Sequence, residues 1–373
     1  MTADLSNWRE APHNIWAFHN VDKVAKVHLI EKDISKSTTL EQDFRSFYDF
    51  KLQIGESQAL DLAKFLKFTN TDGLIVLHNG KIVYEFYDHG NDESSMHILM
   101  TKSVTGLVTG ILANQGKIDV NAPIKDYVPE ASAVYDKITV QNCLDMTTGL
   151  VYDDNNHEYR AASGWTPARG DEPADNLHDF ISKLEASTVD PGTVFNYNSV
   201  NTDLLGWALE RASGKKLADL ISELLWKPMG AEHEAIITVD KNGNARAAGG
   251  LCATVRDLAR VGQVIADGGR GIVPKEWVYD MLYNGDKTAF SRSAWANNFQ
   301  RESASTAYRD CWISNGDNGS LIGLGVYGQM LVVDTKHNMV MAKTSSQPNR
   351  FDSEPMLLAL LAFEEFRRLL ESS

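Results

Sequence analysis

The chain has 373 residues, of which 43% are hydrophobic and 23% charged, as in ordinary soluble globular proteins. This length exceeds what one compact core usually holds, so we expect two domains, or one large domain with another inserted into it. The net charge of −14 argues against nucleic-acid and anionic-membrane partners, because both require a basic surface.

The beginning of the chain has no cationic segment followed by an apolar one, so we expect no secretory signal. No run of about eighteen apolar residues is present, which predicts no membrane span. The three cysteines, Cys143, Cys252 and Cys311, are far apart in the sequence and are expected to be small buried hydrophobic residues rather than disulfide partners. These features predict a cytoplasmic protein.

The first hundred residues combine irregular, helical and strand patterns. Residues 1–30 are rich in aromatic residues without periodicity, which predicts an extended arm laid on the body. The apolar spacing of residues 55–68 predicts a helix. Residues 72–90 contain two β-rich runs joined by Asn79-Gly80, the pattern typical of a tight hairpin.

The remaining elements follow in a clear order. Residues 103–118 predict an apolar helix, and the pattern from about 120 to 235 is mostly helical. Strands return near residue 235, followed by an amphipathic helix over 254–269, a strand–turn–strand segment over 321–346 and a closing helix over 353–372.

Strands at both ends and helices in the middle predict an α+β fold. In this interpretation, residues 1–115 and 236–373 form an antiparallel sheet flanked by helices. Residues 116–235 form an inserted all-helical domain.

No metal site is predicted. The stretch DKNGN (240–244) has the opening of a calcium loop, but Ala245 and Leu251 stand where the loop requires a glycine and a final ligand. The stretch DDNNHE (153–158) lacks the ligand spacing of a known site and predicts a solvated loop. His97 has no evident partner, so we expect a packed or surface histidine.

Lys102 is the first candidate catalytic residue. It stands at the start of the predicted helix in HILMTKSVTG (97–106), where a serine three residues earlier would lie on the same helical face. The helix N-terminus would then direct amide donors at a developing oxyanion. The alternative is a lysine that only pairs with a neighbour or extends to solvent at the start of the helix.

Tyr197 in FNYNSVNTDLLG is the second candidate. A tyrosine hydroxyl that meets Lys102 could pass protons to and from a hydroxyl nucleophile. The alternative is an aromatic side chain that only fills the helical core.

Taken together, these stretches resemble the serine β-lactamase-like hydrolases, which include class C β-lactamases, DD-peptidases, family VIII esterases and 6-aminohexanoate-dimer hydrolases. The resemblance covers nearly the whole chain, and the motifs that carry it stand in the family's order: MTKSVTGLVTGILANQGKI, CLDMTTGL, PGTVFNYNSVNTDLLG and AAGGLCATVRDLARVG. The stretches WREAPHNIWAF and GVYGQMLVVD resemble the 6-aminohexanoate-dimer hydrolase branch most closely.

The resemblance implies a cleft between a sheet domain and a helical domain, and acyl transfer without a cofactor. By position it implies that Lys102 is the motif lysine and Tyr197 the catalytic tyrosine. Asn198 and Ser199 complete the element after the tyrosine. Residues 326–328 (Val326, Tyr327 and Gly328) take the place of the family's K-T-G strand beside the oxyanion hole, and Tyr152 is a further candidate substrate contact.

The serine of the family's S-x-x-K motif is missing. Counting back three residues from Lys102 leads to Leu99, so either serine has become leucine or two residues, serine among them, were deleted between HILM and TKS. A leucine cannot form an acyl-enzyme, which predicts a severely impaired serine mechanism.

Two functional hypotheses follow. The first is a hydrolase of small esters or amides with impaired turnover. The second is a non-catalytic homologue that binds a ligand or partner in the same cleft. Asn156, Arg160 and Ala248 stand where the dimer-hydrolase branch has other polar groups, which weakens the case for its amide substrate.

Overall fold

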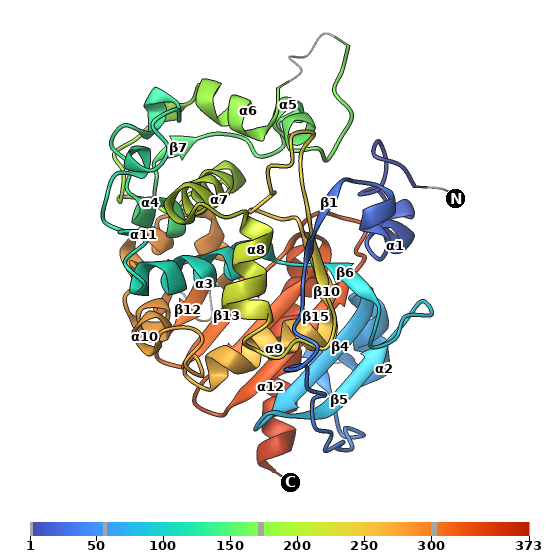
Figure 1. Ribbon diagram of the computed structural model, residues 1–373. Coiled ribbons are helices and arrows are strands. Elements are labelled where there is room, and N and C mark those ends of the chain that lie inside the picture. The colour runs from blue at the N-terminus through green and yellow to red at the C-terminus, as the bar shows by residue number, and fades with distance from the viewer. Residues whose placement is uncertain (1–2, 55–57, 171–174, 300–303, 373) are drawn as a thin grey trace.

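A seven-stranded antiparallel sheet forms the centre of the computed structural model, which describes residues 3–54, 58–170, 175–299 and 304–372 (Figure 1). The strand order is β11-β12-β13-β14-β15-β4-β5. The strands are β4 (Thr71–His78), β5 (Lys81–Tyr87), β11 (Thr306–Arg309), β12 (Trp312–Asn315), β13 (Ser320–Leu324), β14 (Met330–Asp334) and β15 (Met339–Ser345). Segments from both ends of the chain therefore build one sheet, which confirms the predicted α+β class.

The predicted hairpin joins β4 to β5. Asn79 and Gly80 both have positive φ angles, 52° and 78°, as a type I′ turn requires. The next predicted strand segment, 321–346, is wrong in its count, since it contains parts of β13, β14 and β15 rather than two strands.

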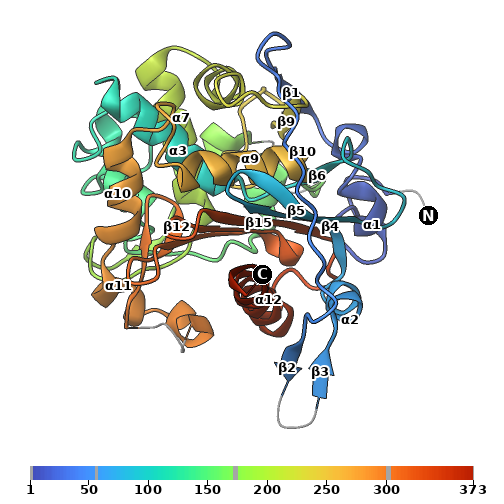
Figure 2. The same ribbon diagram turned by 90° about the horizontal axis from the view of Figure 1, so that it is seen from below.

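Helices cover both faces of this sheet (Figure 2). Helix α9 (Val255–Ala266) packs against β4, β14 and β15 on one face, and its first turn is capped by the Thr254 side chain, which accepts from the amide of Asp257. Helix α12 (Ser353–Glu371) lies on the opposite face, where its apolar side is buried. Both helices confirm amphipathic patterns in the sequence.

A second antiparallel sheet stands beside the first, with the order β1-β9-β10-β6. Its strands are β1 (Val27–Ile30), β6 (Met96–Ile98), β9 (Ala235–Thr238) and β10 (Leu251–Thr254). Strand β6 leads directly into the helix that carries Lys102. Two further antiparallel pairs of short strands are described: β2 (Leu52–Ile54) with β3 (Gln58–Leu60), and β7 (Leu150–Val151) with β8 (Ser187–Thr188).

The helical part lies on one side of the sheets (Figure 1). Its members are α3 (Thr101–Asn114), α4 (Val140–Leu144), α5 (His157–Ala162), α6 (Leu177–Lys183), α7 (Ser199–Ser213) and α8 (Leu217–Ile221), while α10 (Lys275–Tyr283) and α11 (Lys287–Ser291) flank the sheet. One hydrophobic cluster runs from Leu205 of α7 through Leu107 of α3 to Val340 of β15. Packing is therefore continuous between the two parts, and the division at residues 115 and 235 stays a prediction.

Two local predictions near the N-terminus are wrong. Residues 1–30 do not form a wholly extended arm, because they contain α1 (His13–Ala17) and β1. Helix α2 (Leu62–Phe68) begins after Asp61, whose carboxylate caps it by accepting from the Lys64 amide, and residues 58–60 form strand β3 instead of the predicted helix. Residues 55–57 of that prediction lie outside the described part of the chain. Among the described helices, none is long and apolar enough to cross a membrane.

Candidate active site

Lys102 lies in the first turn of α3 and is 8% exposed. Its ammonium donates to the Ser199 hydroxyl at 3.0 Å and to the carbonyl of Ala248 at 2.8 Å. These bonds join the N-termini of α3 and α7 to the segment before β10. The lysine is a buried, fixed group and does not extend to solvent, which removes one of the alternatives considered for it.

Leu99 lies before the helix. Helix α3 begins at Thr101, with Met100 as its extended N-cap residue, and the Leu99 amide donates to the carbonyl of Leu251 at 2.8 Å. The Thr101 hydroxyl in turn accepts from the Leu251 amide at 2.8 Å. The residue three before Lys102 is thus held beside β10 and is not part of the helical face that carries the lysine.

Tyr197 meets Lys102 through its ring. The Lys102 Nζ atom lies 4.7 Å from the centroid of the Tyr197 ring, a cation–π geometry. Trp295 stacks on the same tyrosine, with ring centroids 5.0 Å apart. The two predicted residues are therefore neighbours, but the described contact is with the face of the phenol rather than with its hydroxyl.

The cleft in front of these groups has a volume of about 480 Å³, and a narrower recess of about 60 Å³ continues from it to Lys102. Some residues line both the cleft and the recess: Asp154, Tyr197, Leu324, Gly325, Val326, Gln329 and Arg350. A cavity of this size suits a small molecule. The predicted cleft between the sheet and the helical part is therefore present.

The segment that the resemblance equates with the K-T-G strand is a turn. Residues 326–328 form a short 3-10 turn between β13 and β14, where Tyr327 has φ 61° and Gly328 has φ 91°. A side chain at Gly328 would also meet Gln347, whose Nε2 lies 2.4 Å from the ideal Cβ position. The turn borders the cleft, but the expectation of a strand there is wrong.

The other predicted site residues divide into two groups. Ser199 lines the recess, accepts from Lys102, and donates its amide to both carboxylate oxygens of Asp154 at 2.9 Å. Asn198 is 1% exposed and donates to the carbonyl of Leu150. Tyr152 packs edge-on against Tyr159, and burial raises its pKa. Neither Asn198 nor Tyr152 belongs to the described lining of the cleft or its recess.

Cationic groups gather around the recess. Lys102 is joined there by four arginines, Arg9, Arg160, Arg246 and Arg350. Burial lowers the pKa of Arg9 to about 10, and the charges of the other three arginines act in the same direction. Asp154 supplies a negative charge at the same place. A cationic surface inside a protein of net charge −14 favours an anionic ligand.

The arginines differ in their partners. Arg246 forms a buried ion pair with Asp203 at 3.2 Å, and Asp203 also accepts from the Ala248 amide at 2.9 Å. By contrast, Arg160 and Arg350 both donate to the amide oxygen of Asn155. Arg246 is therefore part of the buried framework of the site. The guanidinium groups of Arg160 and Arg350 have further N–H donors that a ligand could accept from.

Sequence reasoning missed several groups at and near the cleft. Arg9, Arg246 and Arg350 come from three distant segments, and no short motif brings them together. Lys343 of β15 also lines the cleft, where burial lowers its pKa to about 7. The buried partner of His97 is Asp72 of β4, at 2.9 Å. These contacts join segments that are distant in the sequence, so only the three-dimensional structure reveals them.

Comparison with known proteins identifies the family and the fold. The family model described as Beta-lactamase matches residues 69–363. The chain is 33% identical to the 6-aminohexanoate-dimer hydrolase of Paenarthrobacter ureafaciens over 360 residues, covering 92% of this chain and 88% of that protein.

Solved structures of hydrolases also resemble this chain. A proposed 6-aminohexanoate-dimer hydrolase from Bacillus anthracis superposes with a TM-score of 0.88 at 25% identity, covering 99% of this chain and 97% of that one. A family VIII carboxylesterase shares the fold, with a TM-score of 0.60 at 19% identity over 82% of this chain and 95% of that one.

The fold, the cleft and the Lys102–Tyr197 pair define a serine β-lactamase-type hydrolase scaffold. The chain belongs to the Beta-lactamase family. Within that family it is similar to 6-aminohexanoate-dimer hydrolases.

Proposed function

We propose that the cleft binds a small ester or amide that carries a carboxylate, and that acyl transfer is severely impaired. The observation that carries this proposal is the position of Lys102, held between Ser199, Ala248 and the Tyr197 ring without a serine on its own helix face. In this family the missing serine would form the acyl-enzyme.

The chemistry left in the cleft supports binding and proton transfer. Lys102 and Tyr197 both line the recess, which supports proton exchange with a hydroxyl or water bound there. Arg160 and Arg350 can pair with a carboxylate in the two-point geometry that guanidinium groups favour. Serine proteases that lose their catalytic triad retain only binding and oxyanion contributions, roughly 10³–10⁴-fold over water, and we expect a similar residual activity here.

The alternative candidate is a homologue that binds its ligand without turnover, and one observation favours it. Leu99 lines the recess and is 4% exposed, so an apolar side chain stands at the motif position where the family has its serine. The two candidates share one ligand class and differ only in hydrolysis. A cytoplasmic location remains part of the proposal on the grounds given by the sequence.

One matched ligand pair and one ester substrate test the proposal. Glutaric acid monoanilide and butyranilide differ in one carboxylate, and we expect the former to bind at least about tenfold more tightly in calorimetry. Equal binding of the two would contradict the assignment of an anionic ligand. Slow hydrolysis of 4-nitrophenyl hydrogen glutarate that Lys102→Ala abolishes supports the impaired hydrolase. Binding without any Lys102-dependent hydrolysis supports the non-catalytic homologue.

A further inference from the structure

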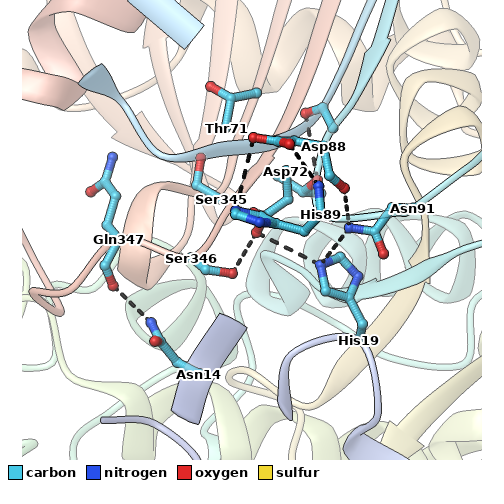
Figure 3. A network of polar contacts seen from close by, with 12 residues as sticks. Asn14, His19, Thr71, Asp72, Asp88, His89, Asn91, Ser345, Ser346 and Gln347 are labelled. Carbon is cyan, nitrogen blue, oxygen red and sulfur yellow. Dashed lines mark hydrogen bonds and ion pairs between the residues drawn. The ribbon is translucent and has the colours of Figure 1, made fainter. Parts of the chain in front are cut away.

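A buried cluster of histidines and a carboxylate lies at the start of β4 (Figure 3). His19 comes from the loop after α1, Asp72 from β4 and His97 from β6. One donor atom of each lies within 4.8 Å of the others. Three segments distant in the sequence thus direct two imidazoles at one carboxylate.

Hydrogen bonds fix the orientation of both rings. The Nδ1 atom of His19 lies 2.9 Å from the carbonyl oxygen of Met96, and that of His97 lies 2.9 Å from the carbonyl oxygen of Ile98. A carbonyl only accepts, so Nδ1 carries the hydrogen in each ring. In a neutral ring, the Nε2 atom then faces Asp72 with its lone pair. Metal-binding histidines are commonly held in this way, with the other ring nitrogen donating to a backbone carbonyl.

Asp72 is 1% exposed, and one of its carboxylate oxygens has no hydrogen-bond partner. Its Oδ2 atom is 2.9 Å from Nε2 of His97 and accepts from the Ser346 hydroxyl, whereas its Oδ1 atom has no hydrogen bond. A buried carboxylate that faces imidazole lone pairs requires a positive charge between them. That charge is either a second proton on an imidazole or a metal ion.

We propose that His19, Asp72 and His97 bind a divalent transition-metal ion of the zinc class. Two imidazole nitrogens and a carboxylate oxygen are a donor set that Zn²⁺ prefers. Tetrahedral Zn²⁺ with bonds of about 2.0–2.1 Å needs ligand atoms roughly 3.3–3.5 Å apart. The separations from Asp72 Oδ2 are 2.9 Å to His97 Nε2 and 3.8 Å to His19 Nε2, so small ring movements would satisfy this geometry.

A water molecule would supply the fourth ligand. The side chain of His89 is 41% exposed and lies near the other carboxylate oxygen, with its Nε2 3.5 Å from Asp72 Oδ1. The Asn91 amide donates to Nε2 of His19 at 3.1 Å and must turn away when the ion enters. Bound metal would fasten the N-terminal segment to β4 and β6. This site does not depend on the proposed function.

Metal titration of the chelator-treated full chain tests the site. We expect one equivalent of Zn²⁺ to bind in competition with a chromophoric chelator, and Co²⁺ to give the visible absorption of a tetrahedral site. His19→Gln, at the accessible side of the cluster, should weaken Zn²⁺ binding by at least ~100-fold. The matched control His337→Gln removes an exposed histidine elsewhere and should leave binding unchanged.

Thermal unfolding gives a second measurement. Saturating Zn²⁺ should raise the melting temperature of the wild-type chain and of His337→Gln, but not that of Asp72→Asn or His19→Gln. Absence of saturable Zn²⁺ binding to the wild-type chain, or equal affinity in His19→Gln, would overturn the proposal. Either result would assign the charge between Asp72 and His97 to a proton.

Discussion

The ammonium of Lys102 lies over the face of the Tyr197 ring, with Nζ 4.7 Å from the ring centroid. Two residues 95 positions apart are thereby coupled at the deepest point of the cleft. The contact uses the ring, and the family chemistry uses the hydroxyl, so substitutions at Tyr197 can separate a structural role from a chemical one.

Tyr197→Phe keeps the aromatic face and removes only the hydroxyl. We expect its free energy of unfolding to stay within about 0.5 kcal/mol of the wild type. Tyr197→Leu loses the cation–π contact and should be destabilised by about 1–2 kcal/mol more than expected from apolar volume alone. Urea unfolding of both variants measures this difference. Equal losses of stability in both variants would show that the contact with Lys102 contributes nothing.

Arg350 should determine preference for a carboxylate. Arg350→Gln removes a guanidinium that lines both the cleft and its recess. We expect binding of glutaric acid monoanilide to weaken about tenfold, because a charge-assisted hydrogen bond contributes about 1.5–3 kcal/mol. Binding of butyranilide should not change. Arg292→Gln, at an exposed position, serves as the control, and a similar loss in that variant would point to a general charge effect.

Gly106 permits close packing between α3 and the segment before β12. An ideal Cβ at this position would lie 2.2 Å from the carbonyl oxygen of Asp310. Gly106→Ala should therefore lower the free energy of unfolding by about 2 kcal/mol or more, despite the better helix propensity of alanine. Gly170→Ala meets no atom within 4 Å and should change stability by less than about 0.5 kcal/mol. Calorimetry of the two variants distinguishes packing from loss of a glycine as such.

His178 should make stability depend on acid pH. Its ring stacks on Trp207 with centroids 3.9 Å apart, and burial lowers its pKa from 6.5 to about 4. Because the folded-state pKa lies below that of the unfolded chain, this contribution is complete above pH 6.5 and is lost as pH falls towards 4. We expect a loss of about 1–2 kcal/mol over that interval, allowing for partial exposure of the ring.

The control for this prediction is His178→Phe, which keeps an aromatic ring on Trp207 and cannot be protonated. Its free energy of unfolding should decline less than that of the wild type between pH 6.5 and 4. Parallel pH profiles for the two chains would show that His178 has the same pKa in the folded and unfolded states.

The sequence predicted those elements that short, local residue patterns determine. The Asn79-Gly80 turn and the amphipathic helix after Thr254 have strong local signals, and the structure confirms both. Helix α2 was extended too far because apolar spacing alone cannot mark a helix start, which the Asp61 cap determines.

In the site, too, the residues within single motifs were predicted and the contacts between separate segments were not. Lys102 and Tyr197 stand in recognisable motifs, and the structure places them in contact. The arginines of the recess and the Asp72–His97 pair were not predicted, because each pairs residues from separate segments. The turn at residues 326–328 was mistaken for a strand because position in a motif does not specify backbone geometry.

The central claim is that the missing serine impairs acyl transfer, and restoring a serine on the helix that carries Lys102 tests it most directly. A Ser-Ala dipeptide inserted between Met100 and Thr101 creates S-x-x-K with the serine inside the lengthened helix, whereas Leu99→Ser places a hydroxyl on the segment bonded to β10. The account predicts that the insertion raises kcat/KM for 4-nitrophenyl hydrogen glutarate by at least ~100-fold, that Leu99→Ser does not, and that Lys102→Ala cancels the gain. A wild-type rate equal to that of the insertion variant, or a gain that survives Lys102→Ala, would contradict it.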